Sequence, residues 1–195
     1  MPESMLVLAY QGDRAYEEAF DLLYIREVSH SNEIWQADHT LLDINVLNGQ
    51  GKPQRPWLTI ILDDFSRAIA SYFLMFDNPS SLHTSLALRQ AIWCKEEKEW
   101  EICTIPEQLY TDHSSDFTSE HIETVCADLK IQLIFSTAGK PRGRGKNERF
   151  FNTLNQNFLC ELPGYLGNDD KQTSLLRFKE LDLQLKDFIN CTKDQ

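Results

Sequence analysis

Two acidic residues, separated by a basic and glycine-rich segment, constrain this chain more than any other feature of its sequence. Asp112 follows a short apolar segment, and Glu148 lies early in the segment 147–159, whose apolar residues recur at helical spacing. Because 148 − 112 = 36, the two acids have 35 residues between them. A third acid, Asp38, stands upstream within a segment that has the pattern of a strand.

Acids carried by two strands and one helix suit a site for hard divalent cations, because Mg²⁺ prefers oxygen ligands and is usually held by a few carboxylates. Two such ions about 3.5–4 Å apart can hold both the attacking and the leaving oxygen of an in-line phosphoryl displacement. We therefore predict that Asp38, Asp112 and Glu148 are the catalytic residues and that they bind two metal ions.

Other acidic residues near this pattern have simpler explanations. Asp43 is the competing acid of the first strand, but its odd offset from Asp38 puts it on the opposite strand face. Asp63 and Asp64 precede a Phe-Ser-Arg sequence at the end of a strand, where such acids usually form a turn. Asp116 is placed to cap the helix that follows it. We leave all four acids out of the predicted site.

The basic residues are concentrated beside Glu148. A net charge of −11 is unusual for a nucleic-acid enzyme, since phosphate binding normally needs a basic face. A charge run is most often only solvated, but in a chain otherwise so acidic this one favours contact with a DNA backbone. The residues predicted to contact DNA are Lys140, Arg142, Arg144, Lys146, Asn147 and Arg149.

Hydrophobic patterning predicts an α/β fold that opens with three antiparallel strands and continues through helical crossovers. The segment 136–146 is rich in Gly, Pro and Arg, and we expect a mobile loop there. The expected strands cover 33–46, 57–62, 68–76, 108–110 and 131–135, and the expected helices cover 13–28, 82–100, 118–129, 147–159 and 174–190.

We expect three parts: an N-terminal linker helix at 1–32, a catalytic core at 33–165 and a C-terminal helical extension at 166–195. No apolar run approaches the roughly 18 residues of a membrane span, and the first residues lack the basic start of a signal peptide. We expect a cytoplasmic protein without a membrane partner. The five cysteines form no C-x-x-C pair, so neither a disulfide framework nor a zinc knuckle is indicated.

Four separated motifs resemble the catalytic core of DDE transposases and retroviral-type integrases, and specifically the bacterial Mu-like transposase branch. One departure concerns the glycine that the family usually has two or three residues after the second aspartate, where this chain has Ser114 and Ser115. We expect a differently shaped loop there. The motifs are IWQADHT at 34–40, ILDDFSR at 61–67, LYTDHSSDFTS at 109–119 and KPRGRGKNERFFNTLNQNFLCELPGY at 140–165.

The resemblance implies a ribonuclease H-like fold, in which a mixed five-stranded sheet is flanked by helices. It implies that Asp38, Asp112 and Glu148 bind two Mg²⁺ or Mn²⁺ ions. Family enzymes use these ions to hydrolyse a phosphodiester at a transposon end and then to join the freed 3′-hydroxyl to target DNA. Both steps are in-line displacements at phosphorus, which agrees with the chemistry expected from the acids themselves.

The resemblance also implies partners: transposon-end and target DNA, further copies of the chain in the active complex, and accessory transposition proteins, all at the bacterial nucleoid. The family's zinc-binding or helix-turn-helix N-terminal module and its basic C-terminal barrel are not in this sequence, so we expect an excised core or a truncated copy.

Two other functions stay open. One is a metal-dependent nuclease of the same fold that only hydrolyses, such as a ribonuclease H or a resolvase. The other is a catalytically silent regulator that binds DNA or a partner transposition protein. The basic loop and the late glutamate on a helix favour the transposase over the nuclease, and the intact acids argue against the silent regulator.

Overall fold

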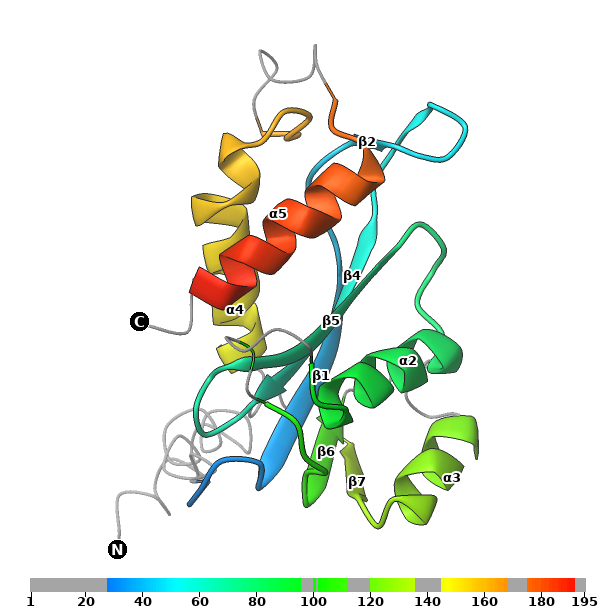
Figure 1. The fold of residues 1–195 in the computed structure, drawn as a ribbon, viewed down its shortest axis with the longest axis vertical. Coiled ribbons are helices and arrows are strands. Elements are labelled where there is room, and N and C mark those ends of the chain that lie inside the picture. Colours follow the sequence, from blue (N-terminus) through cyan, green and yellow to red (C-terminus); the bar gives the residue numbers. More distant parts are fainter. Residues whose placement is uncertain are drawn as a thin grey trace, which may run out of the picture.

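The computed structural model describes residues 28–95, 100, 102–111, 120–135, 145–167 and 175–191. Apart from Val28, the helix expected over 13–28 lies outside these residues, as do residues 136–144 of the expected loop. The elements, shown in Figure 1, are β1 (Ile34–Leu41), β2 (Val46–Leu47), β3 (Pro53–Gln54), β4 (Trp57–Asp63), β5 (Ile69–Met75), α2 (Ser81–Ile92), β6 (Gln108–Thr111), α3 (Glu120–Asp128), β7 (Gln132–Phe135), α4 (Gly145–Asn157), the 3₁₀ helix η2 (Leu159–Glu161) and α5 (Phe178–Cys191).

The main sheet has five strands in the order β5-β4-β1-β6-β7. β1 pairs antiparallel with β4, and β4 pairs antiparallel with β5, whereas β6 pairs parallel with β1 and β7 pairs parallel with β6. This is the mixed sheet that the sequence predicts. Residues 48–52 lie between β2 and β3, which form a small antiparallel ribbon of their own.

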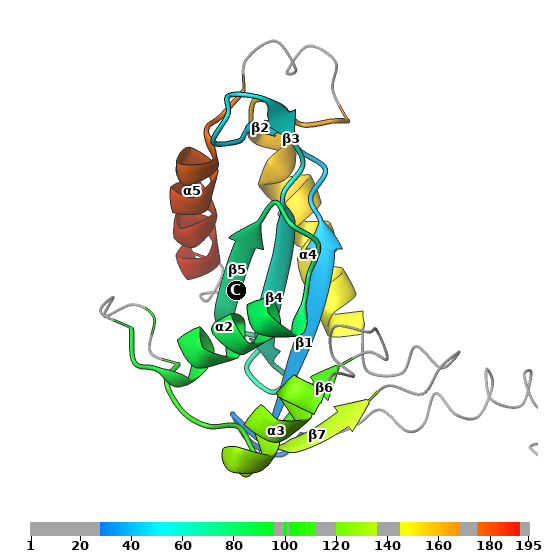
Figure 2. The ribbon, with the colours of Figure 1, turned by 90° about the vertical axis from the view of Figure 1, so that its right-hand side faces the viewer.

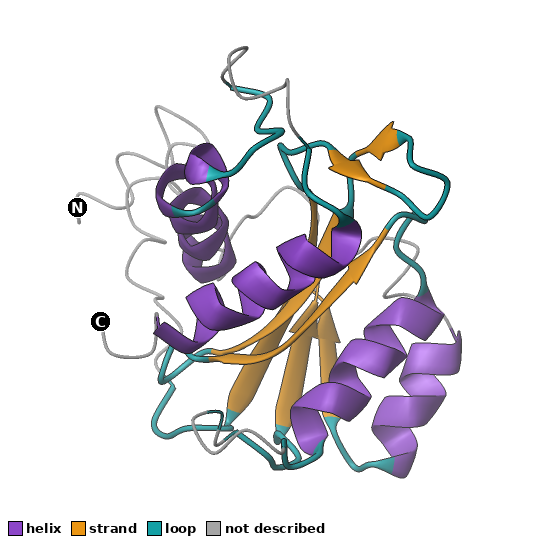
Figure 3. Cartoon of the chain, turned by 45° about the horizontal axis from the view of Figure 1, so that its top comes forward, coloured by secondary structure: helices purple, strands orange, loops and turns teal. Residues whose placement is uncertain are grey.

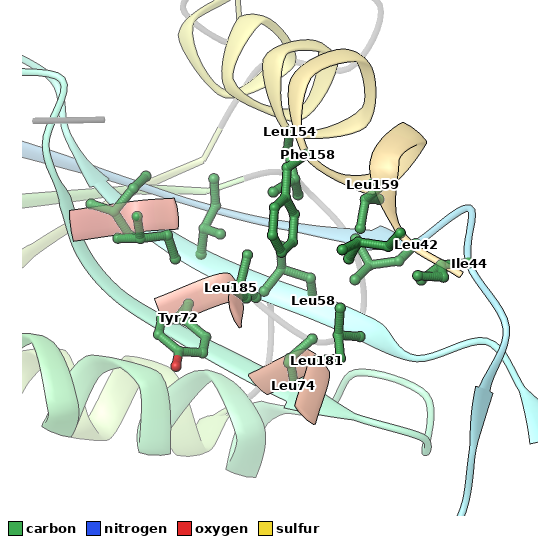
Figure 4. Close-up of a cluster of buried hydrophobic side chains, with 14 of the residues drawn as sticks. Leu42, Ile44, Leu58, Tyr72, Leu74, Leu154, Phe158, Leu159, Leu181 and Leu185 are labelled. Carbon is green, nitrogen blue, oxygen red and sulfur yellow. The ribbon is translucent and has the colours of Figure 1, made fainter. Parts of the chain in front are cut away.

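Helices cover both faces of the sheet, with α2 and α3 on one face and α4 and α5 on the other (Figures 2 and 3). Strand alternation sorts the side chains between the two layers. Trp35 and Ala37 of β1 belong to the cluster under α2 and α3, whereas Leu58 and Leu62 of β4 belong to the cluster under α4 and α5, part of which Figure 4 shows. The long apolar run of β4 is explained by this burial on both faces.

The helix expected to reach Trp100 is shorter than predicted. α2 ends at Ile92, and Trp93 already has an extended backbone with ψ 141°. Trp100 is 2% exposed, and its indole Nε1–H donates to the Ile69 carbonyl of β5 at 2.8 Å. Its ring also stacks on Tyr72, with 5.8 Å between the ring centroids. The prediction was wrong because Trp100 is anchored to the edge strand rather than to the apolar face of α2.

α5 is part of the core layer beside α4. Leu181, Leu185 and Ile189 are each 0% exposed and pack in the cluster that contains Leu58 of β4. The domain boundary expected at 166 stays a prediction, but this burial makes the α4/α5 face of the sheet dependent on α5. Among the helices of the described part, none combines the length and the hydropathy needed to cross a membrane.

A tight crossing joins the chain after α4 to the segment after β1. The Asn45 N–H donates to the Gly164 carbonyl at 2.8 Å, and Ile44 forms an isolated antiparallel bridge with Tyr165. Gly164 has φ +92°, and a Cβ added there would lie 2.2 Å from the Asn45 carbonyl oxygen. Glycine is therefore needed here both for its backbone conformation and for the close approach of the two segments.

Candidate active site

Asp38 lies in the central strand, on the face that α4 covers. It is partly buried and pairs with Ile60 of β4, which packs in the cluster under α4 and α5. Its Oδ1 accepts a hydrogen bond from the His39 N–H at 2.8 Å. Trp35 and Ala37 point to the opposite face, so alternation places Gln36 and Asp38 together on the α4 side.

Asp112 lies outside the described residues, directly after the end of β6 at Thr111. The parallel ladder between β1 and β6 pairs Ile34 with Gln108 and Gln36 with Tyr110, an offset of 74 residues. The same offset separates positions 38 and 112, since 112 − 38 = 74. Within the described part alone, no group of three His, Cys, Asp or Glu side chains is placed to hold a metal ion.

Glu148 is exposed in the first turn of α4, the helix that lies against β1. Carboxylates are favoured at this end of a helix, because the N-terminal backbone N–H groups carry a partial positive charge. Further along the same helix, a groove of about 140 Å³ separates α4 from the end of β1. Phe151 and Asn155 line one side of this groove, and Thr40 to Asp43 line the other.

Lys146 forms an ion pair that the sequence did not indicate. Its Nζ lies 2.7 Å from Asp64 Oδ1 and donates to the Asp64 carbonyl oxygen at 2.8 Å. Asp64 is 1% exposed, and the Gln36 Nε2–H also donates to its Oδ1. The interpretation of Asp64 as a simple turn residue was therefore incomplete. The available signal was alternation, which puts Asp64 on the same strand face as Leu62 and hence under α4.

The remaining predicted DNA contacts divide by exposure. Arg149 is exposed on α4, as a residue that contacts DNA must be. Asn147 is only 2% exposed, and its buried Oδ1 has no hydrogen-bond partner, which makes it the weakest of the six candidates. Lys140, Arg142 and Arg144 lie outside the described residues.

Two excluded acids have the structural roles that their positions suggest. Asp63 forms the predicted turn: its Oδ1 accepts from the Asn32 N–H at 2.8 Å, and its Oδ2 accepts from the Ser66 N–H at 2.9 Å. Asp43 forms an ion pair with Arg55, with 2.6 Å between Oδ1 and the guanidinium nitrogen. Both carboxylates are thus accounted for without a metal ion.

Comparison with known proteins decides the family of this fold and site. The sequence profile of the TnsB C-terminal domain matches residues 36–164, which is more than half of the chain and includes all three predicted catalytic acids. The chain belongs to the TnsB C-terminal domain family. The resemblance to DDE transposases and integrases is thereby confirmed.

Two curated relatives of this TnsB C-terminal domain are transposition proteins. The transposase for transposon Tn552 of Staphylococcus aureus is 55% identical over 189 residues, which cover 97% of this chain and 39% of that protein. The transposon Tn7 transposition protein TnsB of Escherichia coli is 24% identical over 144 residues, which cover 67% of this chain and 20% of that protein. The chain therefore spans well under half the length of either relative.

Solved structures give the same fold for this TnsB C-terminal domain. The simian T-cell lymphotropic virus intasome, solved in complex with PP2A regulatory subunit B56 gamma, matches with a TM-score of 0.60 and 22% identity, over 83% of this chain and 50% of that chain. The HTLV-2 integrase catalytic core domain in complex with magnesium matches with a TM-score of 0.54 and 23% identity, over 82% of this chain and 84% of that chain. The predicted ribonuclease H-like fold is confirmed.

Proposed function

We propose that this chain is the catalytic part of a DNA transposase, which hydrolyses a phosphodiester at a transposon end and joins the freed 3′-hydroxyl to target DNA. The observation that carries the proposal is the packing of α4 against β1, with Asp38 on the covered strand face and Glu148 in the first turn of the helix. The TnsB C-terminal domain family and the Tn552 transposase support it.

Helix and strand geometry supports a short distance between Asp38 and Glu148. β1 and α4 run in the same direction (Figure 2). Glu148 lies three residues before Phe151, a residue of α4 that lines the groove beside β1, and this spacing corresponds to about 4.5 Å along the helix axis. Phe151 and Thr40 line the same groove, so Phe151 lies near the level of Thr40 along β1. A strand rises ~3.3 Å per residue, so the position about 4.5 Å before Thr40 on β1 is roughly that of His39 or Asp38.

Strand register supports the inclusion of Asp112. If the β1–β6 ladder continues at its offset of 74 residues, Asp112 stands opposite Asp38. Alternation would also give Asp112 the same sheet face as Tyr110, whose partner Gln36 lies on the α4 side. Asp38, Asp112 and Glu148 would then offer oxygen ligands only.

This donor set fits a hard divalent cation, and we propose two Mg²⁺ or Mn²⁺ ions held by Asp38, Asp112 and Glu148. Such ions, when bound, activate the attacking oxygen and stabilise the leaving oxygen of each displacement. The chain's own part would be to hold these carboxylates in place, with Asp38 on β1 and Glu148 on α4. Arg149 and the basic residues before α4 would position the DNA backbone.

The proposed partners follow from the same chemistry. The substrates are transposon-end and target DNA in the bacterial nucleoid, and the active complex contains further copies of the chain with accessory transposition proteins. An enzyme that joins two DNA molecules must hold more than one duplex, which favours several copies over one.

The test compares Glu148→Gln with Glu123→Gln in the 195-residue chain. Both glutamates are exposed and lie in the first turn of a helix, α4 or α3, so the second variant is a matched control. We expect Glu148→Gln to weaken Mn²⁺ binding, measured by the free-ion signal in electron paramagnetic resonance, and to abolish Mn²⁺-dependent nicking of supercoiled plasmid. Equal Mn²⁺ affinity in the wild-type chain, Glu148→Gln and Glu123→Gln would show that Glu148 is not a ligand of the metal site.

Joining separates a transposase from a nuclease that only hydrolyses. A labelled duplex with a free 3′-hydroxyl is incubated with plasmid and the wild-type chain, and covalent transfer of the label to the plasmid is measured. Transfer that is lost in Glu148→Gln supports strand transfer by this site. Nicking without transfer would replace the transposase proposal with the nuclease.

A further inference from the structure

The ion pair between Lys146 and Asp64 ties the first turn of α4 to the sheet. One ammonium group makes both contacts, with Oδ1 at 2.7 Å and with the Asp64 carbonyl oxygen at 2.8 Å. Asp64 is 1% exposed and the Lys146 side chain 20% exposed, so the pair lies largely away from water. Such a contact resists separation, because a carboxylate left alone in the interior keeps its full desolvation penalty.

Asp64 is in turn fixed to β1 by two bonds. Its backbone N–H donates to the Ile34 carbonyl at 2.9 Å, and its Oδ1 accepts from the Gln36 amide. Gln36 lies two residues before Asp38, on the same face of β1. The strand that carries Asp38 therefore also holds the partner of Lys146.

We propose that Gln36, Asp64 and Lys146 are positioning residues, which set the place of Glu148 relative to Asp38. The assignment rests on the proposed function, because it presumes that those two carboxylates share a metal site. Lys146 and Glu148 belong to one helical turn, about 3 Å apart along the axis, so any shift at the anchor reaches Glu148. A metal site tolerates displacements of only about 0.5 Å before its ligand geometry is lost.

Other contacts of this turn are weaker constraints. Of its side chains, Lys146 is the one that bonds to the sheet within the described part of the chain. Asn147 is buried, but its Oδ1 has no hydrogen-bond partner and so fixes no direction. The apolar contacts of α4 with the core begin further along, at Phe150, Phe151 and Leu154. The ion pair is therefore the directional link between the sheet and the part of α4 that carries Glu148.

The test uses a double variant that keeps side-chain size and removes both charges, Asp64→Asn with Lys146→Met. Lys146→Arg is the conservative variant, because a guanidinium keeps the charge and the donors. Lys179→Met is the matched control, since Lys179 is the second residue of α5 as Lys146 is of α4, and it is exposed. All variants are made in the 195-residue chain.

The first measurement is amide hydrogen exchange at residues 149–152, the first N–H groups of α4 that can bond within the helix. In the double variant we expect exchange there to be about tenfold faster or more, as befits loss of a charge-assisted hydrogen bond. Exchange in α5 should not change. Lys146→Arg should retain slow exchange at these residues, and Lys179→Met should leave the exchange rates in α4 at their wild-type values. Unchanged exchange in the double variant would overturn the anchor.

The second measurement is Mn²⁺ affinity, with Glu148→Gln as the reference for a lost ligand. We expect the double variant to bind Mn²⁺ about tenfold more weakly or worse, while Lys146→Arg binds nearly as the wild type. Faster exchange with unaltered Mn²⁺ affinity would show an anchor without a positioning role, and so overturn the proposal. If Glu148→Gln itself leaves Mn²⁺ affinity unchanged, the proposed function fails, whereas the exchange measurement still decides whether the pair anchors α4.

Discussion

Leu185 and Leu183 of α5 offer a matched test of whether α5 belongs to the cooperative core. Leu185 is 0% exposed, whereas Leu183, two residues earlier in the same helix, is 63% exposed. Truncation to alanine removes the same atoms and changes helix propensity equally at the two positions. Any difference between the two variants therefore reports burial alone.

The expected cost of Leu185→Ala follows from its surroundings. Figure 4 shows Leu185 among Leu58 of β4, Tyr72 of β5 and Leu181. Two of these neighbours are fixed by the strand ladder, so the layer cannot collapse into the space left by the lost atoms. Burial of this kind places Leu→Ala at about 3–4 kcal/mol, within the usual range of roughly 2.7–5 kcal/mol. Leu183→Ala should change the free energy of unfolding by less than about 0.5 kcal/mol.

Urea unfolding followed by tryptophan fluorescence measures these values on each face of the sheet separately. Trp35 lies in the cluster under α2 and α3, and Trp100 lies in the cluster under α4 and α5. The chain has four tryptophans, so each signal is measured in a variant that retains only Trp35 or only Trp100, with the other three changed to phenylalanine. Both signals should move to lower urea together when Leu185 is truncated. A cost below about 1 kcal/mol, or a shift of the Trp100 signal alone, would show that α5 is an appended helix and refute the reasoning.

Two further stability measurements test local features of the fold. Gly164→Ala should destabilise the chain by more than about 2 kcal/mol in urea unfolding, because the added Cβ would meet the Asn45 carbonyl at 2.2 Å and φ is +92°. Gly49→Ala is the control, since a Cβ there would have nothing within 4 Å. Similar free energies of unfolding for the two variants would contradict the crossing described above. Burial raises the pKa of the Cys126 thiol from 9.0 to about 11. The neutral thiol therefore contributes its full stability below pH 9, and this contribution is lost as the pH rises from 9 to 11, by at most about 3 kcal/mol. Cys126→Ala should flatten that alkaline loss, and an equal loss in the variant would assign it to other groups.

The strands of the sheet were predictable because their signals are local. The apolar run 57–62 and the alternation around Asp38 follow from burial on two faces and from a period of two, so their approximate positions could be read directly. The ion pair of Asp64 with Lys146 could not, because its partners are 82 residues apart. The turn predicted at Asp63 is present in the structure. The neighbouring Asp64, predicted to belong to the same turn, is instead buried, and its local sequence did not indicate this.

The end of α2 was mispredicted for the same reason, because the contact that places Trp100 is distant in the sequence. Helical spacing appeared to continue through Trp93 because apolar residues recur there by chance, and the true partner of Trp100 is a backbone carbonyl 31 residues earlier. The acids of the candidate site were visible in the sequence through their spacing and motifs. The contacts that hold their elements in place were not, since these depend on which helix lies over which strand.

The helices that cover one face of the sheet come last in the chain, and this order has a consequence during protein synthesis. The strands β1, β4 and β5 leave the ribosome first, with Leu58, Ile60 and Leu62 facing the side that only α4 and α5 cover. Until residues 145–191 have emerged, that face has no partner within the described chain and presents an apolar surface to other nascent chains. Chaperone binding to ribosome-bound chains that end before Gly145 should therefore be strong, and should fall once α5 has been released.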